Sequence, residues 1–384
     1  MGVVGCNSPR KMTDKYQVVI VGAGPAGSSA AYFLGKSGIK TLLLDKFEFP
    51  RDKLCGGAIS PRALSVLDEM SFTPLIKGYQ KITGVRFVSP NGSIVDGNVP
   101  KRDSFRNFGY VVPRISFDVM LRDHALTQKG AEFQREEVVD LDYIHKKRIK
   151  TISGKEFEAD FVILANGAVS NLARKAGSSG NVSMPALEAR FEGVRTDDKL
   201  FIYFHRYILP GYLWIFPEGN GKANVGIGMS DQTRKINLME VYNKLLSSDD
   251  IIREVLKDGK PIDLPKKCVI RSRSQPYTSQ IEGILSIGDN GGFANQFSGE
   301  GIYYALQSGK LAARTIEKGK SFAEQSNEFE EDRIISEKLR WIFQDSERVN
   351  EIVRRASENS EFNSLLQGVV TNVIPKKEIM GLLK

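Results

Sequence analysis

Residues 16–27 read YQVVIVGAGPAG and decide the fold of this chain. A β-branched run leads into the pattern GxGxxG, and residues 28–34, SSAAYFL, continue with the spacing of a helix. The glycines therefore lie at a strand-to-helix turn, where helix N-terminal amides bind a diphosphate. We expect Gly22 to permit the tight turn, Gly24 to let the backbone approach the phosphates, and Gly27 to allow close helix packing.

An acidic residue completes this motif. Residues 41–45, TLLLD, predict a second strand that ends on Asp45, and a carboxylate at that position can accept hydrogen bonds from ribose hydroxyls. A glycine-bearing loop of no special function is the alternative for GxGxxG taken alone. Strand, turn, helix and acid together predict a dinucleotide site in a Rossmann-like α/β domain.

The composition is that of an ordinary globular protein with a mildly basic surface. The 384 residues suffice for two domains, and 54 basic against 46 acidic residues give a net charge of +8. The basic residues are scattered and form no aromatic-interleaved motif, so we expect no nucleic-acid partner. Cys6, Cys55 and Cys268 lie far apart, which predicts a reduced, cytoplasmic compartment and no metal site.

The N-terminus carries no recognisable targeting signal. No stretch is long and apolar enough to span a bilayer, and residues 1–15 lack a hydrophobic signal core. We interpret residues 1–15 as a flexible extension, with Met12 as an alternative start.

The order of strands and helices predicts two domains and a helical tail. A hairpin with its turn at Asn91-Gly92 and alternating strands over 185–229 predict an antiparallel sheet. Residues 284–289 predict a parallel strand ending on Asp289, and residues 299–318 a long helix. The predicted boundaries are 1–15 for the extension; 16–80, 101–180 and 281–320 for a discontinuous nucleotide-binding domain; 81–100 and 181–280 for the antiparallel-sheet domain; and 321–384 for the C-terminal helical region.

Residues 288–302, GDNGGFANQFSGEGI, form a second constellation. Asp289 can accept from a ribityl or ribose hydroxyl, while Gly299 and Gly301 let amides at a helix N-terminus approach an electron-rich ring edge. Such amides stabilise an anionic reduced flavin. The alternative is a loop and glycine-rich helix cap without a ligand.

These motifs resemble the FAD-dependent geranylgeranyl reductase family, which belongs to the glutathione-reductase-like, hydroxylase-type flavoproteins. The resemblance covers most of the chain and also rests on residues 50–62 (PRDKLCGGAISPR), 114–118 (RISFD) and 210–217 (PGYLWIFP). It implies a Rossmann-like FAD-binding domain, an antiparallel-sheet substrate domain and a helical C-terminus.

The resemblance also implies roles for individual residues, because the YxWxFP motif lies beside the flavin and the Cys-Gly-Gly turn near its ring. The implied catalytic residues are Cys55, Tyr212 and Trp214. The implied substrate contacts are Tyr212, Trp214, Phe216, Phe293 and Phe297. The implied FAD contacts are Gly22, Gly24, Pro25, Ala26, Gly27, Asp45, Lys46, Cys55, Gly56, Gly57, Arg114, Val139, Asp289, Gly299, Gly301 and Ile302.

Four of these residues have alternative interpretations. Cys55 is either a proton-handling thiol or a small residue whose backbone contacts FAD, and we favour the backbone contact. Tyr212 and Trp214 alternate, so they share one strand face, which borders either a cavity or an ordinary core. Arg114 contacts FAD in the family pattern, although a surface ion pair is the alternative.

The chain departs from the family pattern at two positions. The usual ADGxxSxxR appears as ANGAVSNLAR, with Asn166 in place of the aspartate, and Gln296 replaces a frequent proline. Asn166 keeps an acceptor oxygen, so the turn should survive, but the lost carboxylate alters any contact to a pyridine nucleotide. The electron donor therefore stays open between NAD(P)H and a ferredoxin-type redox partner protein.

The resemblance implies a reductase that saturates C=C double bonds of an isoprenoid chain on a prenyl diphosphate, an ether lipid or a prenylated quinone or pigment. Reduced FAD would deliver the hydride, and the sequence identifies no proton donor. Alternatives on the same fold are a flavin-dependent monooxygenase or halogenase, although their usual GDAAH and WxWxIP patterns are imperfect here. The retained Asp45 and Asp289 argue against a non-catalytic prenyl-binding escort. The lack of four clustered cysteines argues against an iron–sulfur quinone reductase.

The C-terminal residues combine lysines with apolar side chains. One hypothesis is peripheral docking of this region on the inner face of an anionic membrane, and the alternative is packing as a terminal helix on the FAD-binding domain. The apolar residues are Val369, Val370, Val373, Ile374, Ile379, Met380, Leu382 and Leu383, and the lysines are Lys376, Lys377 and Lys384.

Overall fold

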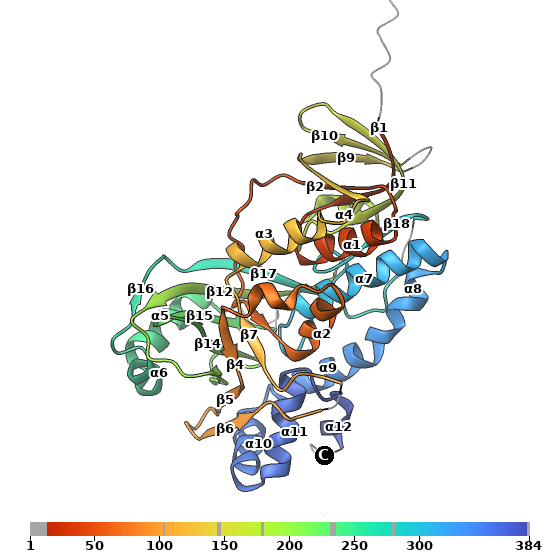
Figure 1. The fold of residues 1–384 in the computed structure, drawn as a ribbon. Coiled ribbons are helices and arrows are strands. Elements are labelled where there is room, and N and C mark those ends of the chain that lie inside the picture. The colour runs from red at the N-terminus through yellow and green to blue at the C-terminus, as the bar shows by residue number, and fades with distance from the viewer. Residues whose placement is uncertain are drawn as a thin grey trace, which may run out of the picture.

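The computed structural model describes residues 14–102, 104–143, 147–177, 180–230, 236–278 and 281–381. It has two large sheets, a small third sheet and a helical C-terminal region (Figure 1). Most of the predicted extension, with Met12 and Cys6, lies outside the described residues, and the first strand already begins at Asp14.

The first sheet has a parallel core in the order β8-β2-β1-β11-β18, as expected for a Rossmann-like domain. These strands are β1 (Asp14–Val21), β2 (Thr41–Asp45), β8 (Ala131–Arg135), β11 (Glu156–Leu164) and β18 (Ile284–Ser286). An antiparallel pair, β9 (Val138–Asp142) and β10 (Lys147–Thr151), extends the sheet beyond β11.

Helices α1 (Pro25–Lys36) and α7 (Ile302–Lys318) pack side by side against this sheet. Their backbones approach closely because a Cβ atom on Gly309 would lie 2.3 Å from the carbonyl oxygen of Ala26. Both helices therefore begin at the same end of the domain. Three shorter helices are α2 (Pro61–Glu69), α3 (Arg114–Ala125) and α4 (Asn171–Lys175), and a 3-10 turn covers Thr73–Ile76.

The second sheet has eight strands in the order β16-β12-β15-β14-β13-β5-β6, with β17 also paired to β12. Its strands are β5 (Gly84–Val88), β6 (Ile94–Asn98), β12 (Val182–Glu192), β13 (Lys199–Tyr203), β14 (Gly211–Gly219), β15 (Lys222–Met229), β16 (Lys260–Pro261) and β17 (Lys266–Ser272). Helices α5 (Leu238–Ser248) and α6 (Asp250–Val255) cover one face, so the other face is left toward the first domain. A small sheet of β3 (Ala58–Ile59), β7 (Gly109–Val111) and β4 (Gln80–Ile82) joins the two domains.

The C-terminal helices begin beside α7 and lead to the end of the molecule opposite to β9 and β10, where the last three of them lie (Figure 1). They are α8 (Phe322–Gln325), a 3-10 turn (Ser326–Phe329), α9 (Glu330–Ile342), α10 (Ser346–Glu358), α11 (Ser360–Val370) and α12 (Lys377–Met380). Gln367 fastens α11 to the second sheet, because its amide accepts from the N–H of Val85 and donates to the same residue's carbonyl, each at 2.9 Å.

This packing buries most of the apolar residues that the membrane-docking hypothesis invoked, whereas Lys377 is exposed and pairs with Glu331 at 3.2 Å. Val369, Val373, Ile374 and Ile379 are at most 4 % exposed, and all of them except Val373 belong to the core beneath the second sheet. Lys376 is also buried and pairs with Asp332 at 2.8 Å. The alternative was right about packing: the region packs on the second sheet and also contacts the FAD-binding domain, where Asn372 hydrogen-bonds to Arg62 and Glu300. Leu382, Leu383 and Lys384 lie outside the described residues.

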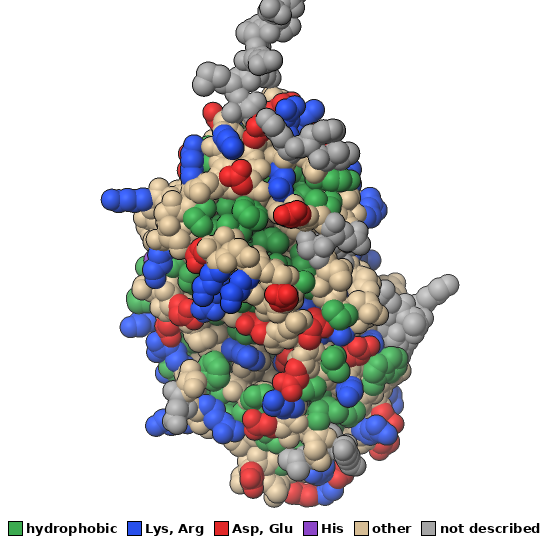
Figure 2. Space-filling view, turned by 90° about the vertical axis from the view of Figure 1, so that its right-hand side faces the viewer, with side chains coloured by type: hydrophobic (Ala, Val, Ile, Leu, Met, Phe, Trp, Pro, Cys, Tyr) green, Lys and Arg blue, Asp and Glu red, His purple; other side chains and the backbone are tan. Residues whose placement is uncertain are grey.

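Charged side chains of both signs are interspersed on the molecular face in Figure 2, with small apolar areas between them. In the described part of the chain, no helix has the length and hydropathy to cross a membrane.

A cavity between the two domains

One cavity of about 1030 Å³ brings together motifs from the whole length of the chain. Its volume lies at or above the upper end of the range typical of single small-ligand pockets, roughly 300–1,000 Å³. Its walls are the GxGxxG turn, residues 51–61, the start of α7, and strands β12, β13, β14 and β17. The cavity therefore has one end in the first domain and one against the second sheet.

At the end of the cavity in the first domain, two positions of the glycine turn, Gly22 and Gly27, leave no space for a side chain. Gly22 has a φ of +107°, and a Cβ there would lie 2.5 Å from the carbonyl oxygen of Ala165. A Cβ on Gly27 would lie 1.8 Å from the carbonyl oxygen of Gly22, so Gly27 packs behind the turn and does not line the cavity. Gly24 is different, because a Cβ there would meet only an Arg51 nitrogen at 3.5 Å. Its backbone is open to the cavity.

Asp45 lies beside this turn at the end of β2 and is 8 % exposed. Its Oδ2 accepts from the N–H of Ala23 at 2.8 Å, and its Oδ1 accepts from the N–H of Phe47 at 2.9 Å. These two bonds hold the carboxylate against the glycine turn. Lys46, Pro25, Ala26 and Val139 line the same end, and Val139 is 47 % exposed, which places it at the rim.

The second glycine motif brings another helix N-terminus to the cavity. Helix α7 begins after Gly301 with no side-chain cap, just as α1 begins after Gly24 with none. Gly299 has a φ of +67°, and with Gly301 and Ile302 it lines the wall. Two uncapped helix ends direct their amides and positive dipole ends at one cavity, which suits an anionic ligand such as a dinucleotide diphosphate.

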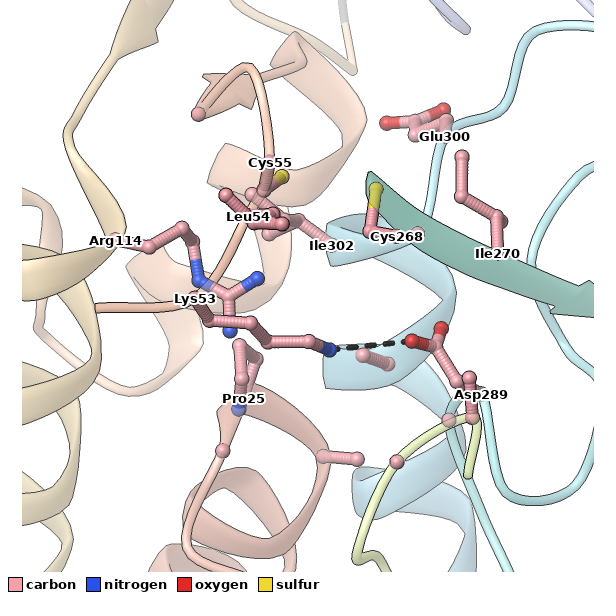
Figure 3. Close-up of a pocket in the computed structure, with 18 of the residues that line it drawn as sticks. Pro25, Lys53, Leu54, Cys55, Arg114, Cys268, Ile270, Asp289, Glu300 and Ile302 are labelled. Atoms are coloured by element: carbon pink, nitrogen blue, oxygen red, sulfur yellow. Dashed lines mark hydrogen bonds and ion pairs between the residues drawn. The ribbon is translucent and has the colours of Figure 1, made fainter. Parts of the chain in front are cut away.

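Asp289 forms an ion pair across this cavity that the sequence did not predict. Nζ of Lys53 lies 3.2 Å from Oδ2 of Asp289. Figure 3 shows the lysine side chain reaching over to the aspartate, with Cys55 and Cys268 on the wall above it in this view. Lys53 comes from the loop after β2 and Asp289 from the loop after β18, so the pair joins the two halves of the nucleotide end.

Arg114 lines the cavity but is held in a buried ion pair, so it is not a surface residue. Its Nε lies 2.6 Å from Oδ1 of Asp118, and Arg51 approaches the other carboxylate oxygen at 3.2 Å. Burial alone would lower the pKa of Arg114, but Asp118 outweighs it and raises the pKa; the Cys55 side chain contributes in the same direction. Arg114 therefore stays charged beneath the Cys-Gly-Gly turn.

Tyr212, Trp214 and Phe216 form an aromatic wall on the cavity face of β14. Gly56 packs against this wall, because a Cβ there would lie 2.6 Å from the Phe216 ring and 3.3 Å from Nε1 of Trp214. The Tyr212 hydroxyl donates to the carbonyl of Ser298 in the second glycine motif. The wall thus runs between the two motifs; its aromatics line the cavity and also belong to a hydrophobic core cluster, so both features of the prediction are present.

Glu188 is a lining residue that sequence reasoning missed. It lies on β12, is 5 % exposed, and its Oε1 accepts from the N–H of Cys55 at 2.7 Å. Burial raises the pKa of Glu188 to about 7, against the opposing effects of hydrogen bonds from Cys55 and Asn224. The available signal was a carboxyl within the buried run 186–189 of a strand.

Glu300 and Cys268, also absent from the predicted site, line the cavity as well. Burial raises the pKa of the Glu300 carboxyl, and it raises that of the Cys268 thiol to about 12. Among the described residues no three His, Cys, Asp or Glu side chains come together as metal ligands.

Phe293 and Phe297 do not line the cavity, which corrects their predicted role as substrate contacts. Phe293 stacks on Tyr277 at a centroid distance of 5.6 Å, and Phe297 meets Phe343 at 4.8 Å. Both rings are used in packing the C-terminal helices. Of the two departures from the family pattern, Asn166 lines the cavity and accepts from Asn290 at 2.6 Å. The other, Gln296, donates to a carbonyl in the core.

Comparison with known proteins agrees with this geometry. The family model described as FAD binding domain matches residues 15–243. The chain is 30% identical to digeranylgeranylglycerophospholipid reductase of Methanococcus aeolicus, over 93% of this chain and 91% of that protein. It is 29% identical to menaquinone reductase of Mycobacterium tuberculosis, over 79% of this chain and 77% of that protein.

A solved structure has the same fold. The geranylgeranyl bacteriochlorophyll reductase-like protein of Thermoplasma acidophilum superimposes with a TM-score of 0.77, over 91% of this chain and 93% of that one. Its sequence identity to this chain is 24%, so the likeness concerns the fold.

Proposed function

Because the chain belongs to the FAD-dependent geranylgeranyl reductase family, we propose that it saturates carbon–carbon double bonds of an isoprenoid chain carried on a lipid. It is an FAD-dependent oxidoreductase. The two glycine turns fit the cofactor, since each supplies an uncapped helix N-terminus and a nearby carboxylate, Asp45 or Asp289.

One observation carries the choice of substrate class. The aromatic wall continues into an apolar surface that lies away from both nucleotide motifs in the sequence, and this surface suits an elongated hydrocarbon chain. The apolar residues that line it are Ile82, Val99, Leu200, Ile202 and Val370. A diphosphate or a polar aromatic substrate has little to bind there.

In the proposed reaction, different residues of this chain bind FAD and position the substrate. Amides at the starts of α1 and α7 bind and orient FAD, and FAD in its reduced form supplies the hydride. Trp214 and Phe216, which contact the Cys-Gly-Gly turn at Gly56, border the alkene on the cavity side of this turn and exclude water, which an unactivated double bond requires. We assign Cys55 a backbone role, because its N–H is the group that the structure ties into the second sheet.

A comparison of three candidate substrates identifies the molecule that carries the isoprenoid chain. Anaerobic, dithionite-reduced protein is mixed with a digeranylgeranyl ether lipid, geranylgeranyl diphosphate and menaquinone, and products are analysed by mass. We expect a gain of two hydrogens for each reduced bond in a lipid-borne chain. If none of the three gains hydrogen while the FAD remains bound and reduced, the proposal is wrong.

The electron donor is decided separately. Oxidised, FAD-loaded protein is mixed without oxygen with NADH, NADPH or a reduced ferredoxin, and loss of the flavin absorbance is followed. We expect either the carrier protein or a pyridine nucleotide to bleach the flavin. The Asn166→Asp variant tests the pyridine nucleotide as donor, because it restores the carboxylate of the family pattern.

A further inference from the structure

We propose that Glu188 donates the proton that completes reduction of the double bond; this inference rests on the proposed function. Glu188 lies on β12, and its carboxyl lines the substrate wall at the Cys-Gly-Gly turn. The proposal gives a role to a buried carboxyl that FAD binding does not use.

The position of Glu188 on the sheet is unusual. In the described part of the second sheet, it is the one charged residue among those that line the cavity. The other lining residues of that sheet are Ala186, Leu200, Ile202, Tyr212, Trp214, Phe216, Cys268, Val269 and Ile270. A lone carboxyl on an apolar face costs free energy, so its placement there needs a function or a structural partner.

Its polar contacts fix the carboxyl beside the aromatic wall. Oε1 of Glu188 accepts from Cys55 at 2.7 Å, and the Asn224 side chain hydrogen-bonds to the same carboxyl. Asn224 in turn accepts from Nε1 of Trp214 at 2.7 Å. Gly56, next to Cys55, packs on Trp214. Glu188 is therefore held where the proposed alkene is clamped.

The electrostatic surroundings keep a large fraction of this carboxyl protonated near neutral pH. Burial and the charge of Asp52 raise its pKa to about 7, while the Cys55 N–H, Asn224 and Arg114 act in the opposite direction. Cys268 on β17 and, from the opposite face of the sheet, Tyr242 on α5 interact electrostatically with it, and each has a raised pKa. An acid with a pKa near the working pH is suited to proton transfer.

The step balances with reduced FAD as the electron source. The C=C π bond breaks, one carbon gains a hydride from the reduced flavin, and the other gains the carboxyl proton of Glu188. Two C–H bonds form, FAD is left oxidised and Glu188 is left as a carboxylate. A proton from solvent then restores the Glu188 carboxyl; Asp52, which also lines the cavity, is paired with Arg190 at 3.2 Å and takes no part in this step.

The other acidic groups on the cavity wall are less suited. Asp289 is paired with Lys53, and Asp45 is held at the nucleotide end by two backbone N–H groups. Glu300 lies in the turn before α7; Asn372 donates to its Oε2 at 3.0 Å, and the charges of Lys376 and Arg62 favour its ionised form, although its Oε1 is buried without a partner among the described residues. The Tyr212 hydroxyl already donates to Ser298, and burial raises its pKa.

The test separates proton donation from a structural role. Glu188→Gln keeps an oxygen that can accept from Cys55 but carries no acidic proton, whereas Glu188→Asp keeps the acid. Glu218→Gln is the matched control, because it removes a half-buried carboxyl with a raised pKa from the same sheet, and this residue does not line the cavity. Single-turnover reduction of the ether lipid is measured against pH, together with FAD content and the infrared carboxyl band of the oxidised protein.

We expect wild-type reduction to slow as the pH rises through about 7, and the infrared band to titrate over the same interval. Glu188→Gln should lose roughly a hundredfold or more in rate, lose the pH dependence and lose the band, while keeping FAD. Glu188→Asp should recover part of the rate, and Glu218→Gln should behave as wild type.

Two results overturn the inference but leave the proposed function intact. In the first, the wild type reduces the lipid and Glu188→Gln reduces it equally fast. In the second, the rate of Glu188→Gln still falls as the pH rises through about 7. Failure of the wild type itself to reduce any isoprenoid would instead reject the proposed function. The infrared titration of Glu188 is then still measurable on its own.

Discussion

Nε1 of Trp214 donates a 2.7 Å hydrogen bond to Oδ1 of Asn224, and the indole lies against Gly226, where a Cβ would come within 2.2 Å of the ring. The orientation of the indole is thus set by a glycine below it and an amide beside it. We expect Trp214→Ala to keep FAD and to lose at least about tenfold in isoprenoid reduction, since it removes substrate contacts worth about 1.4 kcal/mol or more. FAD titration and single-turnover rates measure the two effects.

Asn224→Ala is the companion variant for Trp214. It leaves the indole in place but removes its acceptor, so it should lower activity less than Trp214→Ala. Equal FAD content and full activity in Trp214→Ala would show that the aromatic wall is ordinary core.

Asp289 should matter for FAD more than its partner Lys53 does. Asp289→Ala removes a charged acceptor at the cavity wall, and we expect FAD affinity to fall by roughly ten- to a hundredfold, the equivalent of about 1.5–3 kcal/mol for a hydrogen bond to a charged group. Lys53→Ala breaks the same ion pair but leaves the carboxylate free to accept. Equilibrium titration with FAD should therefore show a loss only in the first variant; equal losses would contradict a direct contact by Asp289.

Gly24 provides a test of the cofactor end that spares the fold. A Cβ at this position would meet only an Arg51 nitrogen at 3.5 Å, so Gly24→Val should fold and place its side chain in the cavity. We expect a colourless protein whose melting temperature equals that of the wild type stripped of FAD. Gly78→Val is the control, because a Cβ there meets nothing within 4 Å and the residue does not line the cavity. A yellow Gly24→Val protein would place FAD elsewhere.

Glu188 should make stability depend on pH. Its pKa is about 7 in the folded protein against an ordinary 4.5, so both states are protonated below that lower value. As the pH rises from there through about 7, the unfolded chain releases its proton first and the free energy of unfolding falls by roughly 3 kcal/mol.

The variant Glu188→Gln should not show this pH-dependent fall in the free energy of unfolding. Its free energy of unfolding relative to wild type should rise by roughly 3 kcal/mol between pH of about 4.5 and about 8, as measured by urea titration at both values. A difference that does not change with pH would show that Glu188 is ionised normally in the fold.

The cofactor end of the cavity could be predicted from the sequence because its determinants are local. Gly22, Gly27 and Asp45 act through a turn and two strand ends that lie close together in the chain, and the parallel order of the strands follows from the motif. The hairpin at Asn91-Gly92 was equally local, and it forms between β5 and β6.

The rest depends on contacts between distant segments. Glu188 meets Cys55, and Lys53 meets Asp289, only after the second sheet and β18 have been placed, and no spacing in the chain encodes either pair. Phe293 was misassigned because an aromatic residue inside a glycine motif resembles a substrate contact, whereas its ring completes a cluster with Tyr277. Lys376 was misjudged for the same reason, since it finds a buried partner in Asp332.

The most direct test of the central claim is the mass of the product from one turnover of stoichiometrically reduced protein with a geranylgeranylated lipid, run once without oxygen and once under ¹⁸O₂. A reductase with the substrate held against the aromatic wall should add two hydrogens per double bond without oxygen and introduce no ¹⁸O in its presence. Incorporation of ¹⁸O, with no hydrogen gained under anaerobic conditions, would contradict the reductase assignment and identify the protein as a monooxygenase on the same fold.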